Sequence, residues 1–167
     1  RQPLVKPAIS NMFDFEGEVA IVIGKTARAI SEKDALSCVA GYTIMMDGSV
    51  RDWQKHSVTA GKNFDGSTPL GPWMLSADEA GPHDAFELQT RLNGTVMQAA
   101  KTSELIWSIP YLISYCSTFT TIEPGDVIST GTPAGVGHKR NPQVFMKPGD
   151  VIEVTVSGIG TLSNTVA

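Results

Sequence analysis

Apolar, β-branched runs that are bounded by acidic residues and glycine dominate the first part of the chain. Four of the five residues from Val19 to Ile23 are β-branched, and with the two preceding glutamates they predict a buried strand over 16–23. A second apolar run, Tyr42–Met46, stops at Asp47 and predicts another strand. Two acidic segments are therefore expected at neighbouring strand ends.

Turn signals in the second half of the chain also separate short strands. The runs Phe86–Leu92 and Thr95–Gln98 flank Asn93-Gly94, a dipeptide typical of a tight β-hairpin. The phrase Pro-Gly-Asp-Val-Ile occurs twice, at 124–128 and at 148–152, and each copy predicts a turn that leads into a strand.

Two short helices interrupt this β pattern. The first is expected to begin after the N-cap Ser31 and to end at Gly41. The second is expected to begin after Ser108, with Pro110 in its first turn, and to end at about Ser117. The predicted fold class is mostly β with short helices (α+β).

Length and composition fit one globular domain over residues 1–167, with 41% hydrophobic and 18% charged residues. The net charge of −4 and the lack of a basic stripe argue against nucleic acid as a partner. Neither a membrane-spanning apolar run nor a signal peptide is visible, so we expect no membrane partner and a cytoplasmic protein. Cys38 and Cys116 are expected to be free thiols.

Glu16, Glu18 and Asp47 are the residues that could carry chemistry as a group. Side chains two apart on a strand share a face, so Glu16 and Glu18 stand side by side and repel unless a proton or cation lies between them. Alone, the pair is typical of a solvated strand end. With Asp47 it becomes a candidate site for a hard divalent ion, Mg²⁺ or Mn²⁺, whereas no Cys/His spacing supports zinc.

Two further groups offer hydrogen-bond donors. Arg51, Gln54 and Lys62 suit a carboxylate or a developing oxyanion, although each alone is more typical of a surface or structural residue. The glycine-rich segment 131–137 can cradle an anion with its N–H groups or simply form a tight turn. The hydroxyl of Thr132 favours a carboxylate pocket.

Most of the chain resembles the fumarylacetoacetate hydrolase family, with the motifs in family order. The segments that carry the resemblance are Phe15–Ala20, Ile23–Lys25, Gly41–Thr43, Asp47–Gln54, Gly61–Asp65, Pro69–Trp73, Asn93-Gly94 with Gln98, Pro124–Asp126 and Thr130–Gly137. The resemblance implies a mixed β-sheet roll or barrel that is usually a homodimer.

The same resemblance assigns roles within the site. It implies an Mg²⁺ or Mn²⁺ ion held by Glu16, Glu18 and Asp47. It also implies that the reacting end of the substrate is lined by Lys62, Gln54 and Arg51. The carboxylate of the substrate would be held by Thr132 with Gly131.

Family members act on small 2-oxo acids, so the resemblance implies a small-molecule substrate of that class. We expect a hydrolase that cleaves a C–C bond through a metal-stabilised enolate. A decarboxylase or isomerase of 2-oxo or 2-hydroxy-diene dioates on the same metal site is the alternative. A second alternative is a non-catalytic domain that only binds a small acid.

The chain departs from the family pattern in several places. Gly48 replaces a bulkier residue and Asn63 replaces a serine, and both changes are expected to reshape the pocket. No His/Glu pair that could activate water precedes Glu16, and the distance from Lys6-Pro7 to Glu16 is shorter than usual. We therefore expect that an N-terminal part with its lid, and a stretch near Ser10-Asn11, are missing from this sequence.

Overall fold

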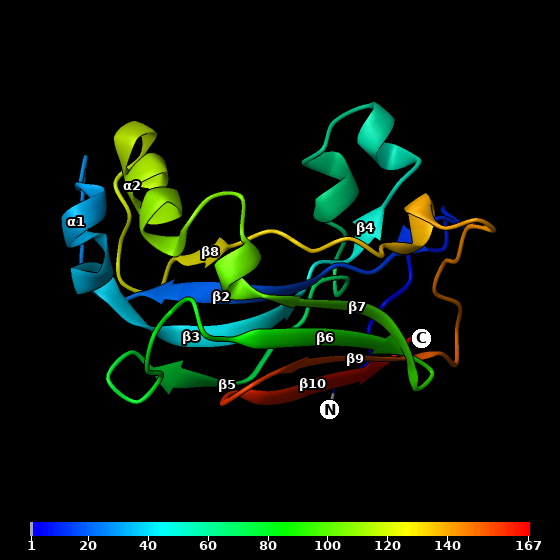
Figure 1. Ribbon diagram of the computed structural model, residues 1–167. Helices are drawn as coiled ribbons and strands as arrows, with labels where there is room; N and C mark the ends of the chain where they lie inside the picture. The colour runs from blue at the N-terminus through cyan, green and yellow to red at the C-terminus, as the bar shows by residue number, and fades with distance from the viewer. Residues whose placement is uncertain (1) are drawn as a thin grey trace.

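Two four-stranded antiparallel β-sheets lie face to face in the computed structural model, which describes residues 2–167 (Figure 1). The first sheet has the order β5-β3-β2-β8, with strands β2 (Gly17–Ile23), β3 (Val39–Met46), β5 (Leu70–Ser76) and β8 (Val127–Ser129). The second has the order β10-β9-β6-β7, with strands β6 (Glu87–Leu92), β7 (Thr95–Lys101), β9 (Val151–Val156) and β10 (Gly160–Thr165). A separate two-stranded sheet joins β1 (Phe13–Asp14) and β4 (Ser49–Val50).

Short helices cover the first sheet. The α-helices are α1 (Glu32–Ala35) and α2 (Ile109–Phe119), and the 3-10 helices are η1 (Leu36–Cys38), η2 (Trp53–Lys55), η3 (Ala60–Lys62), η4 (Thr102–Glu104) and η5 (Gly137–Lys139). Helices α1 and α2 pack together over one end of the sheet, and the segment with η2 and η3 stands over the other end, beside β4 (Figure 1).

Side chains alternate along β2, so that apolar core residues lie on one face of the strand and the glutamate carboxylate lies on the other. Ile21 and Ile23 are 0% and 1% exposed, and with Gly17 they belong to the face that packs on the second sheet. At Gly17 the sheets approach so closely that a Cβ atom would lie 2.0 Å from Oγ1 of Thr90 on β6. Glu18 therefore belongs to the opposite face, toward the short helices.

The predicted hairpin and both turn-to-strand phrases are present. Asn93 and Gly94 have φ values of +50° and +79° between β6 and β7, as a two-residue hairpin turn of this type requires. The strands β8 and β9 follow the two Pro-Gly-Asp turns. Ser31 and Ser108 cap the two α-helices, accepting hydrogen bonds from Asp34 N and Tyr111 N.

Several predicted boundaries are wrong. The first helix does not run to Gly41, because the chain turns after η1 and enters β3 at Val39. Gly41 lies inside that strand, where a Cβ atom would lie 2.2 Å from the carbonyl oxygen of Leu75 on β5. The strands β5 and β10 were not predicted, since a Gly-Pro step interrupts the first and polar residues fill much of the second.

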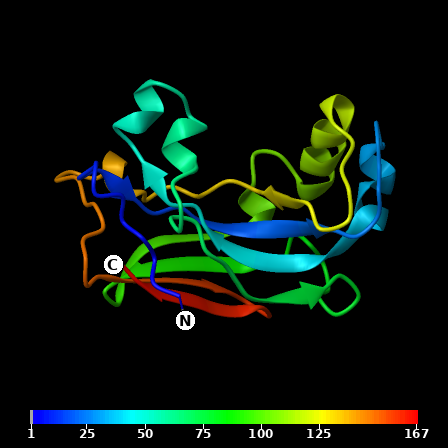
Figure 2. The ribbon, with the colours of Figure 1, turned by 180° about the vertical axis from the view of Figure 1, so that it is seen from behind.

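The predicted class, mostly β with short helices, is confirmed, and the sheets do not close into a barrel. Within these sheets all strand pairs are antiparallel, and a parallel bridge joins Leu4 to Val166. This bridge brings the two ends of the chain close together, as the view from behind shows (Figure 2). Across residues 2–167 no helix is long and apolar enough to cross a bilayer.

Candidate active site

Three carboxylates meet where β2 and β3 run side by side. Glu16 directly precedes β2, Glu18 lies on it, and Asp47 follows β3, whose residue Met46 pairs with Gly17. The N–H of Asp47 donates to the carbonyl of Glu16 at 2.8 Å, which fixes the two strand ends against each other. One oxygen from each of the three carboxylates lies within 4.8 Å of the others. The structure thus brings the predicted acidic group together.

Lys62 lies between two of these acids. Its Nζ donates at 2.5 Å to Oε2 of Glu16 and at 2.5 Å to Oδ2 of Asp47. Lys62 is the last residue of η3, so this short helix positions an ammonium group directly over the strand ends. Burial alone would lower the pKa of Lys62, but its hydrogen bonds to Asp47 and Glu16 outweigh burial and raise it. The side chain is therefore a cation here.

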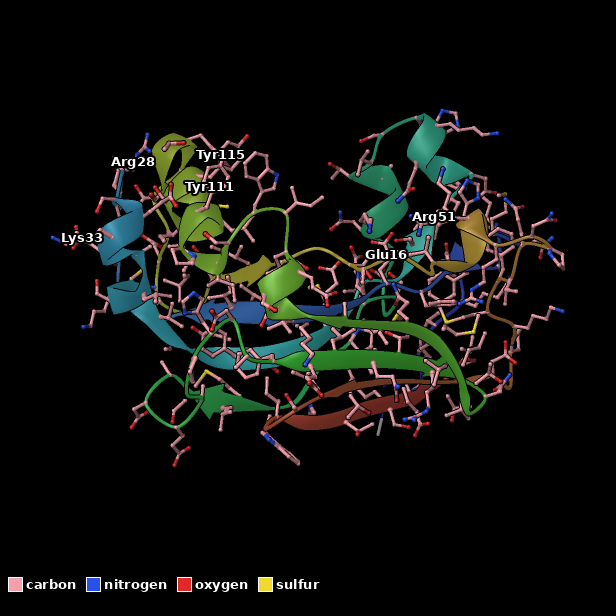
Figure 3. The ribbon with its side chains drawn as sticks, viewed as in Figure 1. Glu16, Arg28, Lys33, Arg51, Tyr111 and Tyr115 are labelled. Atoms are coloured by element: carbon pink, nitrogen blue, oxygen red, sulfur yellow. The ribbon has the colours of Figure 1, made fainter. Side chains whose placement is uncertain are left out.

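Arg51 approaches Glu16 from the other side (Figure 3). Its Nε donates at 2.8 Å to Oδ2 of Asp14, and its Nη2 lies 2.6 Å from Oε1 of Glu16. Both contacts pair the guanidinium with a carboxylate. Burial alone would lower the pKa of Arg51, but these two acids outweigh burial and raise it. Arg51 is therefore a cation that is held beside Glu16.

Asp14 is a fully buried carboxylate that was not among the predicted site residues. Oδ1 accepts hydrogen bonds from the N–H groups of Phe15 and Gly137, and Oδ2 accepts from Arg51 and the N–H of His138. Asp14 therefore links the arginine to the glycine-rich segment. Its alternation with Glu16 and Glu18, every second residue, is the sequence signal that could have identified it.

Burial and mutual repulsion raise the pKa values of two acids of the group, Glu18 and Asp47. Burial, followed by the charges of Asp47 and Glu16, raises the pKa of Glu18 to about 8. Burial also raises the pKa of Asp47, against the opposing effect of Lys62. Without a further cation, Glu18 holds a proton at neutral pH.

The charge balance and donor chemistry fit a divalent metal ion. The cluster contains four carboxylates, from Asp14, Glu16, Glu18 and Asp47, but only two cationic side chains, Arg51 and Lys62. Full ionisation leaves two negative charges, which one divalent ion balances. An all-oxygen set of this kind suits Mg²⁺ or Mn²⁺. Glu16, Glu18 and Asp47 are the residues that could hold it.

The glycine-rich segment packs directly against the carboxylate strand. The N–H of Gly131 donates to Oε2 of Glu18 at 3.1 Å. The hydroxyl of Thr132 donates to the carbonyl of Gly17 at 3.0 Å and accepts from Nε2 of Gln98 at 2.8 Å. This hydroxyl, expected to face a substrate carboxylate, here holds the segment against β2.

Gln98 on β7 is a second residue to which the sequence analysis gave no role. The side chain is 2% exposed, and besides Thr132 it contacts the N–H of Gly17 and the carbonyl of Pro133. A glutamine inside an apolar strand gives no local sign of such partners. Only the packing of the two sheets reveals them.

The other predicted positions lie around this centre. Oε1 of Gln54 accepts from Nη1 of Arg51 at 3.3 Å, so it contacts the arginine and none of the three acids. Asn63 is exposed and donates to the carbonyl of Thr59. At Gly48 a Cβ atom would lie 2.0 Å from the carbonyl oxygen of Ser67, which explains why a bulkier residue is absent there.

A cavity of about 470 Å³ lies along the glycine-rich segment. Thr130, Gly131 and Thr132 form one wall, and η4 with the residues that lead into α2 forms another. Gly131 also donates to Glu18, but none of the three carboxylates lines the cavity. Its volume lies within the range of about 300–1,000 Å³ that small-molecule sites occupy.

Fold and site together describe a β-sheet protein with a candidate oxygen-only cation site at two strand ends. The family model for the fumarylacetoacetate (FAA) hydrolase C-terminal domain matches residues 1–167. The chain belongs to the fumarylacetoacetate hydrolase family, as the resemblance predicted.

Curated relatives in this family carry out several reactions. The chain is 41% identical over 160 residues to oxaloacetate tautomerase YisK of Bacillus subtilis (strain 168), covering 95% of this chain and 53% of the relative. It is 42% identical over 162 residues to 2,4-didehydro-3-deoxy-L-rhamnonate hydrolase of Sphingomonas sp. (strain SKA58), covering 95% and 57%. It is 39% identical over 168 residues to the 4-hydroxyphenylacetate degradation bifunctional isomerase/decarboxylase of Salmonella dublin, covering 99% and 38%. The chain thus spans about half or less of these relatives' length.

Solved structures agree on the fold. Fumarylacetoacetate hydrolase from Exiguobacterium antarcticum matches with a TM-score of 0.94 at 41% identity, covering 99% of this chain and 60% of that one. Fumarylpyruvate hydrolase from Pseudomonas aeruginosa, solved with Mn²⁺ and pyruvate, matches with a TM-score of 0.90 at 30% identity, covering 99% and 70%. The similar proteins are therefore enzymes, and one of them binds a divalent metal.

Proposed function

We propose that this chain is the catalytic domain of a divalent-metal-dependent hydrolase that cleaves a C–C bond in a small 2-oxo acid. The observation that carries the proposal is the meeting of Glu16, Glu18 and Asp47, with ligand oxygens within 4.8 Å of one another. When these acids and Asp14 are all ionised, the cluster has two negative charges in excess. The hydrolases among the similar proteins support the reaction class.

Mg²⁺ or Mn²⁺ held by the three carboxylates would supply a Lewis acid that stabilises negative charge on the oxo acid as the bond breaks. Arg51 binds and orients the substrate, because its guanidinium is a cation held directly beside Glu16 of the carboxylate group. Lys62 presents an ammonium group at Nζ that can balance developing negative charge or deliver a proton.

Isomerisation or decarboxylation at the same site is the second candidate. The polar partners of the three carboxylates within residues 2–167 are Arg51, Lys62 and the N–H of Gly131, and no histidine is among them. Hydrolysis needs a base that activates water, whereas proton shifts and loss of CO₂ do not. The tautomerase and isomerase/decarboxylase relatives fit this alternative.

A side-by-side assay tests these candidates. The purified protein is incubated with Mn²⁺ or Mg²⁺ and with acetylpyruvate, oxaloacetate or a hydroxy-diene dioate, and the products are identified. We expect metal-dependent cleavage of acetylpyruvate, which falls about 100-fold or more in Lys62→Met but not in the exposed control Lys55→Met. Isomerised or decarboxylated products would favour the second candidate. Metal binding without any turnover would favour a non-catalytic domain that binds a small acid.

We further propose that the protein is a homodimer whose small-molecule partner is the 2-oxo acid substrate, with neither nucleic acid nor membrane as a partner. Helix α2 presents a row of aromatic side chains, in which Tyr111 stacks on Tyr115 (Figure 3). Phe119 meets Tyr115 edge-on, and these two residues are 64% and 55% exposed. Exposed aromatic faces of this kind are typical of protein interfaces. Sedimentation velocity of the wild type and of Phe119→Ser tests this proposal.

A further inference from the structure

Both side-chain oxygens of Glu16 are engaged by cationic side chains. Oε1 lies 2.6 Å from Nη2 of Arg51, and Oε2 accepts a hydrogen bond at 2.5 Å from Nζ of Lys62. Glu18 and Asp47 differ from Glu16, because the described residues supply a donor to only one oxygen of each. A divalent ion on Glu16 would therefore meet a positive charge at either oxygen, and the repulsion favours withdrawal of one of the two side chains.

Arg51 is the more firmly held of these two cations. Its Nε donates to Asp14 at 2.8 Å, and its Nη1 donates to Gln54 at 3.3 Å. Asp14 is fully buried and also accepts hydrogen bonds from backbone N–H groups, so it is a rigid partner. A planar guanidinium that is held in this way cannot turn away from Glu16 without breaking several contacts at once.

Lys62 is held only by acids that a metal ion would bind. Within the described part of the chain, Nζ has two hydrogen-bond partners, Oε2 of Glu16 and Oδ2 of Asp47. The side chain is 21% exposed, against 11% for Arg51, and its ammonium group ends a flexible four-carbon stem. Lys62 can therefore leave both acids by rotation of its own side chain.

From these contacts we infer that Lys62 competes with the metal ion for Glu16 and Asp47, leaves both acids when the ion binds, and then binds the anionic 2-oxo acid. The inference rests on the proposed function, because it needs the metal site at the three carboxylates. Metal and substrate binding are thereby coupled, since the ammonium group that leaves the two acids becomes a partner for the substrate. Coupling of this kind is reciprocal, so the 2-oxo acid also tightens the binding of the ion.

Mn²⁺ titrations followed by electron paramagnetic resonance test the competition without relying on turnover. In the absence of any organic acid, Lys62→Met should bind Mn²⁺ about tenfold more tightly than the wild type, because the variant has no ammonium group to displace. The matched control Lys55→Met removes an exposed positive charge from η2 and should leave the affinity unchanged. If the folded Lys62→Met protein binds Mn²⁺ no more tightly than the wild type, the competition is refuted.

The same titrations in the presence of pyruvate measure the coupling. Pyruvate should tighten Mn²⁺ binding in both proteins, because its carboxylate and oxo oxygens are themselves ligands for the ion. The factor should be severalfold larger in the wild type than in Lys62→Met, because only the wild type has an ammonium group that passes from the acids to pyruvate. Equal factors in the two proteins would overturn the inference.

A crystal structure of the Mn²⁺-loaded wild type tests the displacement without any variant. Nζ of Lys62 should lie beyond hydrogen-bond distance, about 3.5 Å, from both Glu16 and Asp47. If Nζ still donates to both acids while the ion is bound, the inference is overturned and the proposed function stands. If the wild type binds no Mn²⁺ at all, both proposals are refuted together.

Discussion

The side-chain oxygen of Gln98 accepts a hydrogen bond at 3.0 Å from the N–H of Gly17, the residue between Glu16 and Glu18. The amide nitrogen of the same side chain donates to Thr132 and to the carbonyl of Pro133. One residue of the second sheet therefore fixes both the carboxylate strand and the glycine-rich segment. Gln98 is a positioning residue, since it touches none of the three acids.

Replacing Gln98 with methionine should weaken both stability and the metal site. The variant keeps the shape of the side chain but leaves the N–H of Gly17 without its partner and removes one of the two hydrogen bonds of the Thr132 hydroxyl. Each unsatisfied buried group costs about 1–3 kcal/mol. Urea denaturation should show a loss of this size together with weaker Mn²⁺ binding, whereas Gln89→Met on the neighbouring strand should change neither.

The Asp14→Asn substitution tests how Arg51 is held. The carboxylate is 0% exposed and accepts four hydrogen bonds, one of them from Nε of Arg51. Breaking a buried ion pair from one side costs about 3–5 kcal/mol. We expect destabilisation in this range in thermal unfolding, with a lower affinity for pyruvate. Equal pyruvate affinity in a folded Asp14→Asn protein would show that Arg51 does not bind the substrate.

Close packing at Gly17 predicts a pair of mutational effects. A methyl group there would lie 2.0 Å from Oγ1 of Thr90, so Gly17→Ala should destabilise the fold by about 1–3 kcal/mol. Removing the obstructing oxygen with Thr90→Ala should restore part of the loss in the double variant. Additive effects in this double-mutant cycle would contradict the contact.

The metal-free protein should lose stability as the pH rises. The pKa of Glu18 is about 8 in the folded chain and about 4.5 when unperturbed, so the folded chain binds this proton more tightly than the unfolded chain does. The resulting stabilisation is complete below about pH 4.5, decreases above it and is lost as the pH rises through about 8. Its size is on the order of a few kcal/mol.

Thermal unfolding in EDTA between pH 5 and pH 9 measures this effect. The wild type should lose more stability over this range than Glu18→Gln, which carries no titrating carboxyl at this position. With saturating Mn²⁺ the trend should reverse, because the ion binds the deprotonated acid and binding to the folded state adds stability. Identical pH profiles for the wild type and Glu18→Gln would contradict the shifted pKa.

The sequence predicted the group of three carboxylates more fully than the architecture around it. Glu16, Glu18 and Asp47 lie at strand ends whose apolar runs are visible in the sequence, so their convergence follows from strand pairing. Asp14 and Gln98 were not predicted because their importance depends on partners 124 and 81 residues away, His138 and Gly17. Local patterns contain no information about such contacts.

The errors in the fold have a similar origin. Helical periodicity favoured continuation to Gly41, but pairing of β3 with both β2 and β5 outweighs the local preference and begins the strand at Val39. The strand β10 is polar because it lies at the edge of its sheet, with solvent on one side. It is a strand because it pairs with β9, which its own sequence does not indicate. Tertiary contacts decide these segments.

The most direct test of the central claim is a Mn²⁺ titration followed by electron paramagnetic resonance. The wild type should bind one Mn²⁺ per chain, and the Glu16→Gln/Glu18→Gln/Asp47→Asn variant should bind none, because its ligand set has no carboxylate left. A control that replaces the exposed acids Glu79, Asp84 and Glu123 by their amides should bind as the wild type does. Wild-type stoichiometry and affinity in the folded site variant would contradict the account.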